Sequence, residues 1–159
     1  MTTTTTPNLS ATFARELVSQ LWDEVQPLLE AHWREIAKHK DIPLSPNRVA
    51  YGMMETAGIL RCFTARLDGL LIGYAAYMVA PALHYSTSRE ARQDVLFLVP
   101  AFRRSRIGAQ LITFADDELR RDGVQVVHQH VKVAHNFGPL LERLGYEHVE
   151  HIYSKRLDR

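Results

Sequence analysis

"VPAFRRSRIGAQLI", residues 99–112, joins an apolar run to a segment with helical spacing. The run before it, "DVLFLV" over residues 94–99, is nearly continuous in apolar residues, which is typical of a strand buried on both faces. From residue 107 onward the apolar positions recur every three or four residues and predict an amphipathic helix. We expect Ser105 to cap this helix and Gly123 to end it. A buried strand therefore runs almost directly into the start of a helix.

This turn has the properties of an anion site. Unpaired backbone N–H groups and the positive end of the helix dipole meet at a helix start, an arrangement that suits phosphate. Gly108 and Ala109 leave the first turn bare, and Arg103, Arg104 and Arg106 add forked donors around it. The same residues also fit a solvated arginine cluster on an ordinary strand-to-helix turn, so the pattern alone leaves both interpretations open.

The composition indicates one soluble globular domain. The chain has 159 residues, 46% hydrophobic and 23% charged, and its net charge of +1 gives no general attraction to nucleic acid or to an anionic membrane. The single cysteine, Cys62, excludes an internal disulfide and favours a reducing, cytoplasmic location. No apolar run reaches the ~20 residues of a membrane helix. We expect residues 1–10 to be a disordered tail without a signal peptide, followed by one domain over 11–159.

Helices dominate the expected N-terminal third. Residues 12–39 show helical spacing, and Pro27 is expected to split them into two helices. Residues 45–58 predict a short helix capped by Ser45, with Pro46 in its first position. The residues expected on one buried face of the first helix are Phe13, Leu17, Leu21 and Val25.

Strands and helices alternate in the remainder. Asp68-Gly69 lies between two apolar runs and predicts a tight hairpin. A long polar loop is expected over residues 81–93, a strand over 124–133, a helix over 136–145 and a last strand over 148–157. This order predicts an α/β (α+β) fold, a mixed sheet with helices on both faces.

The central stretch resembles the acyl-CoA signature of the GCN5-related N-acetyltransferases (GNAT), Arg/Gln-x-x-Gly-x-Gly/Ala. Arg103 fills its first position and Gly108 its last, whereas Arg106 stands where the first glycine is usual. "LFLVPAFR" is similar to that family's approach to the signature, and "NFGPLLERLGYE" resembles its later helix. The resemblance covers roughly residues 55–157 and is closest to compact phage and prophage members. It implies a mostly antiparallel sheet with a central, splayed pair of parallel strands.

The resemblance also implies acetyl-CoA as co-substrate and no metal. A bulge at Leu98 or Val99 would free a backbone N–H for the thioester oxygen, and the parted strands would accept the pantetheine arm like an added strand. Asn136 could contact that arm, or it could equally cap the helix that follows it. The residues expected to bind the co-substrate are Leu98, Val99, Arg103, Arg104, Ser105, Arg106, Ile107, Gly108, Ala109 and Asn136.

Family members pass the acetyl group directly to a primary amine, which must first lose a proton. Asp94 is the first candidate base, because it shares strand parity with Leu96 and Leu98. His130, on one face with His128 and Lys132, is the second candidate, and His84 in the polar loop could line the acceptor pocket. Each of the three could instead be an ordinary solvent-exposed residue.

The proton donor for the departing thiolate is not evident. Many family members carry a tyrosine in the later helix where this chain has Leu141, so Tyr85, Tyr153 or water would have to serve. The resemblance places the acceptor pocket between the N-terminal helices and the loop after the hairpin, without deciding between a small amine and a peptide or protein amine. The residues expected around it are His32, Tyr51, Glu55, His84 and Tyr85.

Two other functions remain open. One is a catalytically weak acyl-CoA-binding module, which the missing tyrosine favours. The other is an acetyltransferase acting on nucleic acid or aminoacyl-RNA, which the near-zero net charge disfavours. His128 and His130 alone do not make a metal site. We expect an amine acceptor and no membrane partner, and the exposed last strand could support a homodimer.

Overall fold

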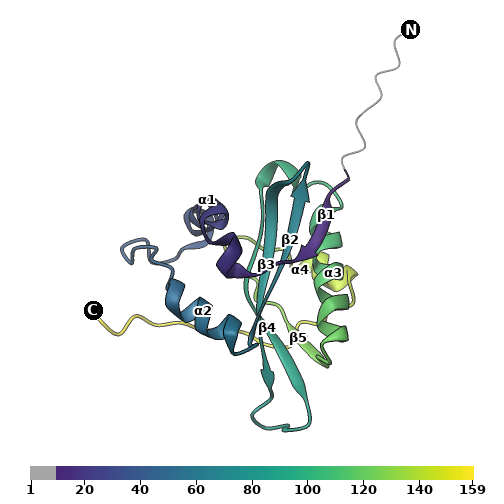
Figure 1. The fold of residues 1–159 in the computed structure, drawn as a ribbon. Coiled ribbons are helices and arrows are strands. Elements are labelled where there is room, and N and C mark those ends of the chain that lie inside the picture. The colour runs from purple at the N-terminus through teal and green to yellow at the C-terminus, as the bar shows by residue number, and fades with distance from the viewer. Residues whose placement is uncertain (1–9) are drawn as a thin grey trace.

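The computed structural model describes residues 10–159, so the predicted tail lies outside the described residues except for Ser10. A five-stranded sheet is covered by α1 and α2 on one side and by α3 and α4 on the other (Figure 1). In chain order the elements are β1 (Thr12–Arg15), α1 (Val18–Ile36), α2 (Arg48–Thr56), β2 (Leu60–Leu67), β3 (Leu70–Pro81), β4 (Arg89–Leu98), the 3-10 turn η1 (Pro100–Phe102), α3 (Ile107–Arg121), β5 (Val126–His128) and α4 (Gly138–Arg143).

The sheet has the strand order β1-β2-β3-β4-β5, antiparallel except for the parallel pair β4–β5. This confirms the predicted fold class. The hairpin is confirmed as well, since Asp68 (φ 49°) and Gly69 (φ 82°) both adopt the left-handed conformation of a two-residue turn between β2 and β3. The parallel pair lies at one edge of the sheet, not at its centre.

The predicted last strand over residues 148–157 is wrong, because residues 147–159 contain neither strand nor helix. Val149, Tyr153 and Leu157 share the parity of one strand face, but the segment pairs with no strand of the described sheet and that face stays unburied. The four large apolar residues of the segment are all exposed: Val149, Ile152, Tyr153 and Leu157.

The first predicted helix begins later than expected. Residues 12–15 form β1, paired with β2, and Phe13 packs against Phe114 of α3 at 6.0 Å between ring centroids. Leu21 and Val25 of α1 pack on the opposite sheet face, and Leu17 is 49% exposed. The helical spacing across residues 13–25 therefore arises by chance. It spans a strand, β1, and a helix, α1, whose apolar residues pack in different cores.

Pro27 lies inside α1 and does not divide it. A proline leaves the carbonyl four residues earlier without its helical partner. That residue is Asp23, and both Asp23 and Pro27 are exposed, so water can satisfy the freed carbonyl. A solvent-facing proline is thus compatible with a continuous helix here.

Two other boundaries differ from the prediction. Helix α2 is capped by Asn47, whose side chain accepts a hydrogen bond from the Ala50 N–H at 3.0 Å, and not by Ser45. The polar loop shortens to residues 82–88, because β3 and β4 continue to the pair Pro81↔Arg89. On that part of β4, Ala91 and Gln93 alternate into the interior, which gives the polar segment a buried face.

Hydrophobic side chains fill both sheet faces. Phe63, Ile72 and Leu98 pack with α3 on one face, and Tyr74 and Phe97 pack with α1 on the other. α2 adds partly buried residues to the second core.

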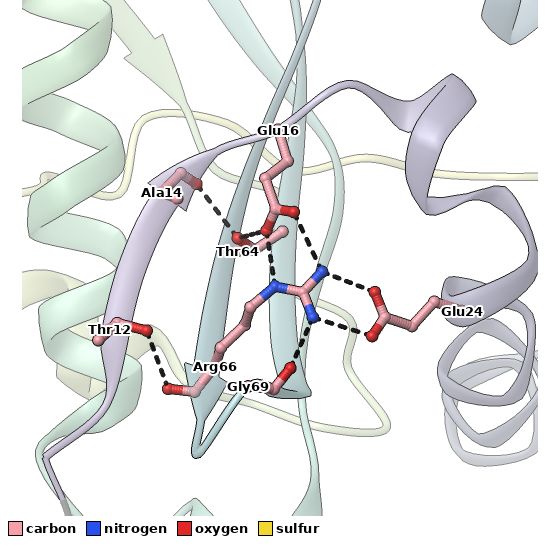
Figure 2. Close-up of polar contacts among 7 residues, drawn as sticks. All are labelled: Thr12, Ala14, Glu16, Glu24, Thr64, Arg66 and Gly69. Carbon is pink, nitrogen blue, oxygen red and sulfur yellow. Dashed lines mark hydrogen bonds and ion pairs between the residues drawn. The ribbon is translucent and has the colours of Figure 1, made fainter.

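An ionic network fastens β1 and α1 to the sheet (Figure 2). The Arg66 guanidinium binds the Glu16 carboxylate at 2.9 and 3.0 Å and the Glu24 carboxylate at 2.6 and 2.9 Å. Buried Thr64 donates to Glu16 and to the Ala14 carbonyl. The chain segment between strand and helix is held by these contacts and positions α1 over the sheet.

Candidate active site

Strands β4 and β5 diverge soon after they meet. Their pairing covers only Glu90↔Val126 to Arg92↔His128, so the strand predicted over residues 124–133 is limited to three residues. Beyond that point the His130 N–H donates to the Gln93 side-chain oxygen at 2.8 Å. A buried side chain thus replaces the ladder and leaves the C-terminal half of β4 open on that side.

The open edge of β4 carries backbone groups of Leu98. The Val99 N–H donates to the Ile72 carbonyl at 2.8 Å. Because hydrogen-bonding direction alternates along an antiparallel strand, the N–H and C=O of Leu98 point away from β3. The carbonyl accepts from Arg103 Nε at 2.7 Å, and the N–H faces the open edge. Of the two amides predicted to be freed, that of Val99 is therefore occupied.

The bulge in β4 lies at Asp94, not at Leu98 or Val99. Ala76 pairs with Val95 but Tyr77 pairs with Gln93, so Asp94 is the extra residue. The bulge turns Asp94 away from the face of Leu96 and Leu98, contrary to the parity prediction, and toward α1 and α2. There the Tyr51 hydroxyl donates to Asp94 Oδ2 at 2.6 Å.

The start of α3 has the predicted bare amides. The backbone N–H groups of Arg104, Arg106, Gly108 and Ala109 donate to no group in the described part of the chain. A Cβ at Gly108 would lie 3.6 Å from the Leu98 side chain, an ordinary contact, so the fold itself has room there for a larger residue. The Arg104 and Arg106 side chains are exposed and form no salt bridge within residues 10–159. These features suit a diphosphate.

Three predicted ligand residues are engaged inside the protein. Besides binding Leu98, Arg103 donates to both Glu35 carboxylate oxygens at 2.9 Å and lies 5.3 Å over the Phe97 ring. The Ser105 hydroxyl accepts from the Ile107 N–H at 3.2 Å and donates to the Phe102 carbonyl at 2.5 Å. Ile107 itself is a core residue. Through its bonds to Leu98 and Glu35, Arg103 links the end of β4 to α1.

The later helix contributes capping and packing. Asn136 Oδ1 accepts a hydrogen bond from the Gly138 N–H at 2.8 Å, but the residue that caps α4 is Phe137, so the predicted cap at Asn136 is wrong by one position. Its contact with the pantetheine arm stays a prediction. Leu141, at the position of the expected tyrosine, is buried. Tyr146 donates to Asp116 at 2.6 Å and receives a hydrogen bond from Gln129, a structural contact of the α3 side.

The remaining candidates are dispersed. His84 and Tyr85 lie exposed in the loop at the far end of β4, roughly 15 Å of strand from Asp94. Glu55 accepts from the Val18 N–H and the Ser19 hydroxyl, both at 2.5 Å, and so caps α1 rather than facing a substrate. Tyr153 is 91% exposed in the C-terminal segment.

Two partly buried histidines lie near β4. His32 of α1 packs at 5.3 Å from the Phe97 ring, and burial lowers its pKa although Glu35 opposes the change. Burial, aided by the positive charges of Lys132 and Arg92, also lowers the pKa of His130. Both imidazoles are therefore neutral near pH 7 and can accept a proton.

Sequence reasoning missed Glu35, Gln93 and Tyr74. Gln93 belongs to the polar stretch that the pattern assigned to a loop, so nothing local marked it as buried. Glu35 is 68 residues from the arginine that it binds, and nothing local identifies it. The hydroxyl of Tyr74 is buried without a hydrogen-bond partner among the described residues. Burial raises the pKa of Tyr74, and burial together with the Asp94 contact raises that of Tyr51.

Residues 10–159 contain no group of three His, Cys, Asp or Glu side chains placed to hold a metal ion. Among the same residues, no helix combines the length and apolar character needed to cross a bilayer.

Comparison with known proteins gives a family match and many similar folds. The profile described as "Acetyltransferase (GNAT) family" matches residues 21–146. No curated protein sequence matches the chain. Among similar solved structures is an aminoglycoside acetyltransferase from an uncultured soil metagenomic sample, with TM-score 0.71, 16% identity and coverage of 92% of this chain and 96% of that one.

Two further structures have comparable similarity. A ribosomal-protein-alanine N-acetyltransferase from Brucella melitensis biovar Abortus 2308 gives TM-score 0.72 at 17% identity, covering 93% of this chain and 99% of that one. A predicted acetyltransferase from Clostridium acetobutylicum, solved with acetyl-CoA, gives 0.69 at 12% identity, covering 93% and 97%. At these identities the likeness concerns the fold. The finer placement among phage and prophage members stays a prediction that none of these structures supports.

Proposed function

Because the chain belongs to the acetyltransferase (GNAT) family, we propose that it transfers the acetyl group of acetyl-CoA to a primary amine of a small molecule, peptide or protein. The observation that carries this proposal is the open edge of β4, which leads directly to the bare amides at the start of α3. A co-substrate held by its diphosphate at that helix start can extend along the edge.

The described residues fit acetyl-CoA in two ways. Gly108, Ala109 and the exposed Arg104 and Arg106 would hold the diphosphate. The Leu98 N–H would donate to the thioester oxygen as negative charge develops there. Acetyl-CoA supplies an activated acetyl group in the form of a thioester.

The acceptor side is the sheet face under α1 and α2. Asp94 would take one proton from the ammonium form of the amine, directly or through a water molecule. In the transfer the C–N bond forms, the C–S bond breaks, and the amine loses its second proton while the departing sulfur gains one. Leu141 stands at the position of the expected tyrosine, so we assign the proton on sulfur to solvent.

A thiol-release assay tests this function. The purified protein is mixed with acetyl-CoA and a panel of amines: an aminoglycoside, a peptide with a free N-terminus, a polyamine and an aminoacyl-RNA. We expect amine-dependent release of free thiol with at least one of the first three, and acetylated product by mass spectrometry. Thiol release that is the same with and without every amine would remove the proposal.

Coenzyme A binding is measured separately by calorimetry. We expect heat of binding with the parent protein and none with Gly108→Glu, because the added carboxylate would repel the diphosphate. The buried Leu141 favours a second candidate, a catalytically weak acyl-CoA-binding module, since α4 has no proton donor there. Binding heat without turnover of any amine would favour that candidate.

A further inference from the structure

A small cavity lies beside Asp94, between the sheet and α1. Its volume is about 20 Å³. α1 contributes to its wall the side chains of Val18, Leu21, Trp22, Val25 and Leu29, none of them charged. The polar groups around it come from Tyr51, Tyr74, Asp94 and the thiol of Cys62.

Tyr74 lines this cavity, and its hydroxyl has no hydrogen-bond partner among the described residues. Tyr74 is 3% exposed, and its hydroxyl oxygen has no hydrogen bond within residues 10–159. A buried hydroxyl left unpaired costs free energy, so native proteins satisfy nearly all such groups with protein atoms or ordered water. On the same cavity, Asp94 already accepts one hydrogen bond from Tyr51 and can accept more.

The cavity has the size of one water molecule. A polar cavity needs about 10–15 Å³ to hold a water, and that water needs two to four polar partners. Tyr74, whose hydroxyl can donate, and Asp94, whose carboxylate can accept, both line this cavity. Larger ligands do not fit without repacking of the apolar α1 side chains.

We propose that an ordered water in this cavity accepts a hydrogen bond from Tyr74 and donates one to Asp94, so that Tyr51 directly and Tyr74 through water position the carboxylate. Both tyrosines are positioning residues, and their effect on catalysis rests on the proposed role of Asp94 as base. Two hydrogen-bond donors fix the orientation of the carboxylate.

The other nearby titratable groups do not compete. Burial raises the pKa of Cys62 on β2 to about 12, so the thiol stays neutral. From α2, Arg48 stacks over the Trp22 ring at 5.6 Å. On β4, the Arg92 guanidinium lies 3.6 Å from the Glu90 carboxylate.

A crystal structure and melting curves test the water without reference to activity. We expect density for one water within hydrogen-bond distance of Tyr74 Oη and Asp94, and a Tm about 2–4 °C lower in Tyr74→Phe than in the parent. Tyr77→Phe is the matched control, because its hydroxyl binds Gln129 at 2.9 Å in the other core. An empty cavity together with a raised Tm for Tyr74→Phe would overturn the proposal, because the hydroxyl would then be unpaired.

The split between kcat and coenzyme A affinity tests the positioning role. We expect kcat to fall about tenfold in Tyr51→Phe and about threefold in Tyr74→Phe, with the Kd for coenzyme A within about twofold of the parent value, because the carboxylate loses part of its fixed orientation. Tyr77→Phe should lower the Tm and leave kcat unchanged. An unchanged kcat in Tyr74→Phe contradicts the proposal. If no amine is turned over, the proposed function fails, while the density and melting curves still decide the cavity water.

Discussion

Gly73 marks the closest approach of β3 to β4. A Cβ there would lie 2.8 Å from Leu98 Cδ1 and 2.9 Å from the Phe97 carbonyl oxygen, so backbone must move to accept it. We expect Gly73→Ala to lower the free energy of unfolding by about 1–3 kcal/mol, measured by urea denaturation. Gly108→Ala is the control: its Cβ meets only an ordinary contact at 3.6 Å, and alanine favours a helix. Equal stability of both variants would contradict the packing argument.

Asp94→Asn separates catalysis from co-substrate binding. An amide of the same shape can still accept the Tyr51 hydrogen bond, but it cannot take a proton from an amine. We expect kcat to fall by about 10² or more while the Kd for coenzyme A stays within about twofold. Asp117→Asn, on an exposed part of α3, should leave both values unchanged. A normal kcat in Asp94→Asn would exclude this base and leave His130 as the next candidate.

Arg103 illustrates what a motif fixes at a single residue. The sequence pattern predicts that Arg103 lies in the turn between a strand and a helix, and the structure has it between β4 and α3. Its partners Glu35 and the Leu98 carbonyl depend on how α1 crosses the sheet, which no local pattern contains. Asp94 is similar, since one extra residue in the strand reverses the face that parity assigns to it.

The network around Arg66 predicts acid sensitivity of the β1–α1 connection. Hydrogen bonding to Arg66 lowers the pKa of Glu16 from its usual 4.5. A lowered folded-state pKa means that the carboxylate stabilises the fold above about pH 4.5 and that this contribution is lost as pH falls through the lower folded value. We expect Glu16→Gln to be less stable by about 1 kcal/mol at pH 7, with the difference shrinking below pH 4.

Unfolding curves between pH 3 and pH 7 measure this difference, with Glu30→Gln as control. Glu30 binds only Arg34 on the exposed surface of α1, so its removal should change stability little. A Glu16→Gln deficit that persists unchanged at pH 3 would assign the effect to packing and not to charge.

In helix α2, one glycine substitution is expected to raise the free energy of unfolding and another, just beyond the helix, to lower it. Gly52 lies inside the helix with nothing within 4 Å of its Cβ position, so Gly52→Ala should raise the free energy of unfolding by about 0.5–1 kcal/mol. Gly58, just beyond the same helix, has φ +71°, and Gly58→Ala should lower it by about 1 kcal/mol. Urea midpoints that shift in the same direction for both would refute the conformational argument.

Element types were predictable where one period runs without interruption, as in α3 and the hairpin of β2 and β3. They were not predictable where two elements meet by chance in one pattern, as across residues 13–25, or where tertiary contacts end a strand. β5 stops because Gln93 of a neighbouring strand binds His130. Pro27 remains in α1 because the carbonyl that it leaves without a partner belongs to the exposed residue Asp23, where water can satisfy it.

At the scale of the whole molecule, charge matters by position. The chain carries a net charge of only +1, yet Arg104 and Arg106 stand exposed beside the bare amides of α3. An anion bound there meets local positive potential that the overall charge does not reveal. The motif marks the start of α3, where these charges and amides lie together, whereas the acceptor side depends on long-range packing of α1 and α2.

Calorimetry with coenzyme A at several salt concentrations measures this local field. We expect Arg104→Ala and Arg106→Ala each to weaken binding about fivefold and to reduce its salt dependence, with unchanged Tm, because both side chains lie in solvent. Arg121→Ala, at the other end of α3, should leave the affinity unchanged. Arg103→Ala should lower the Tm as well, since it also releases Glu35 and the Leu98 carbonyl. Affinities equal across all four variants would mean that coenzyme A binds elsewhere.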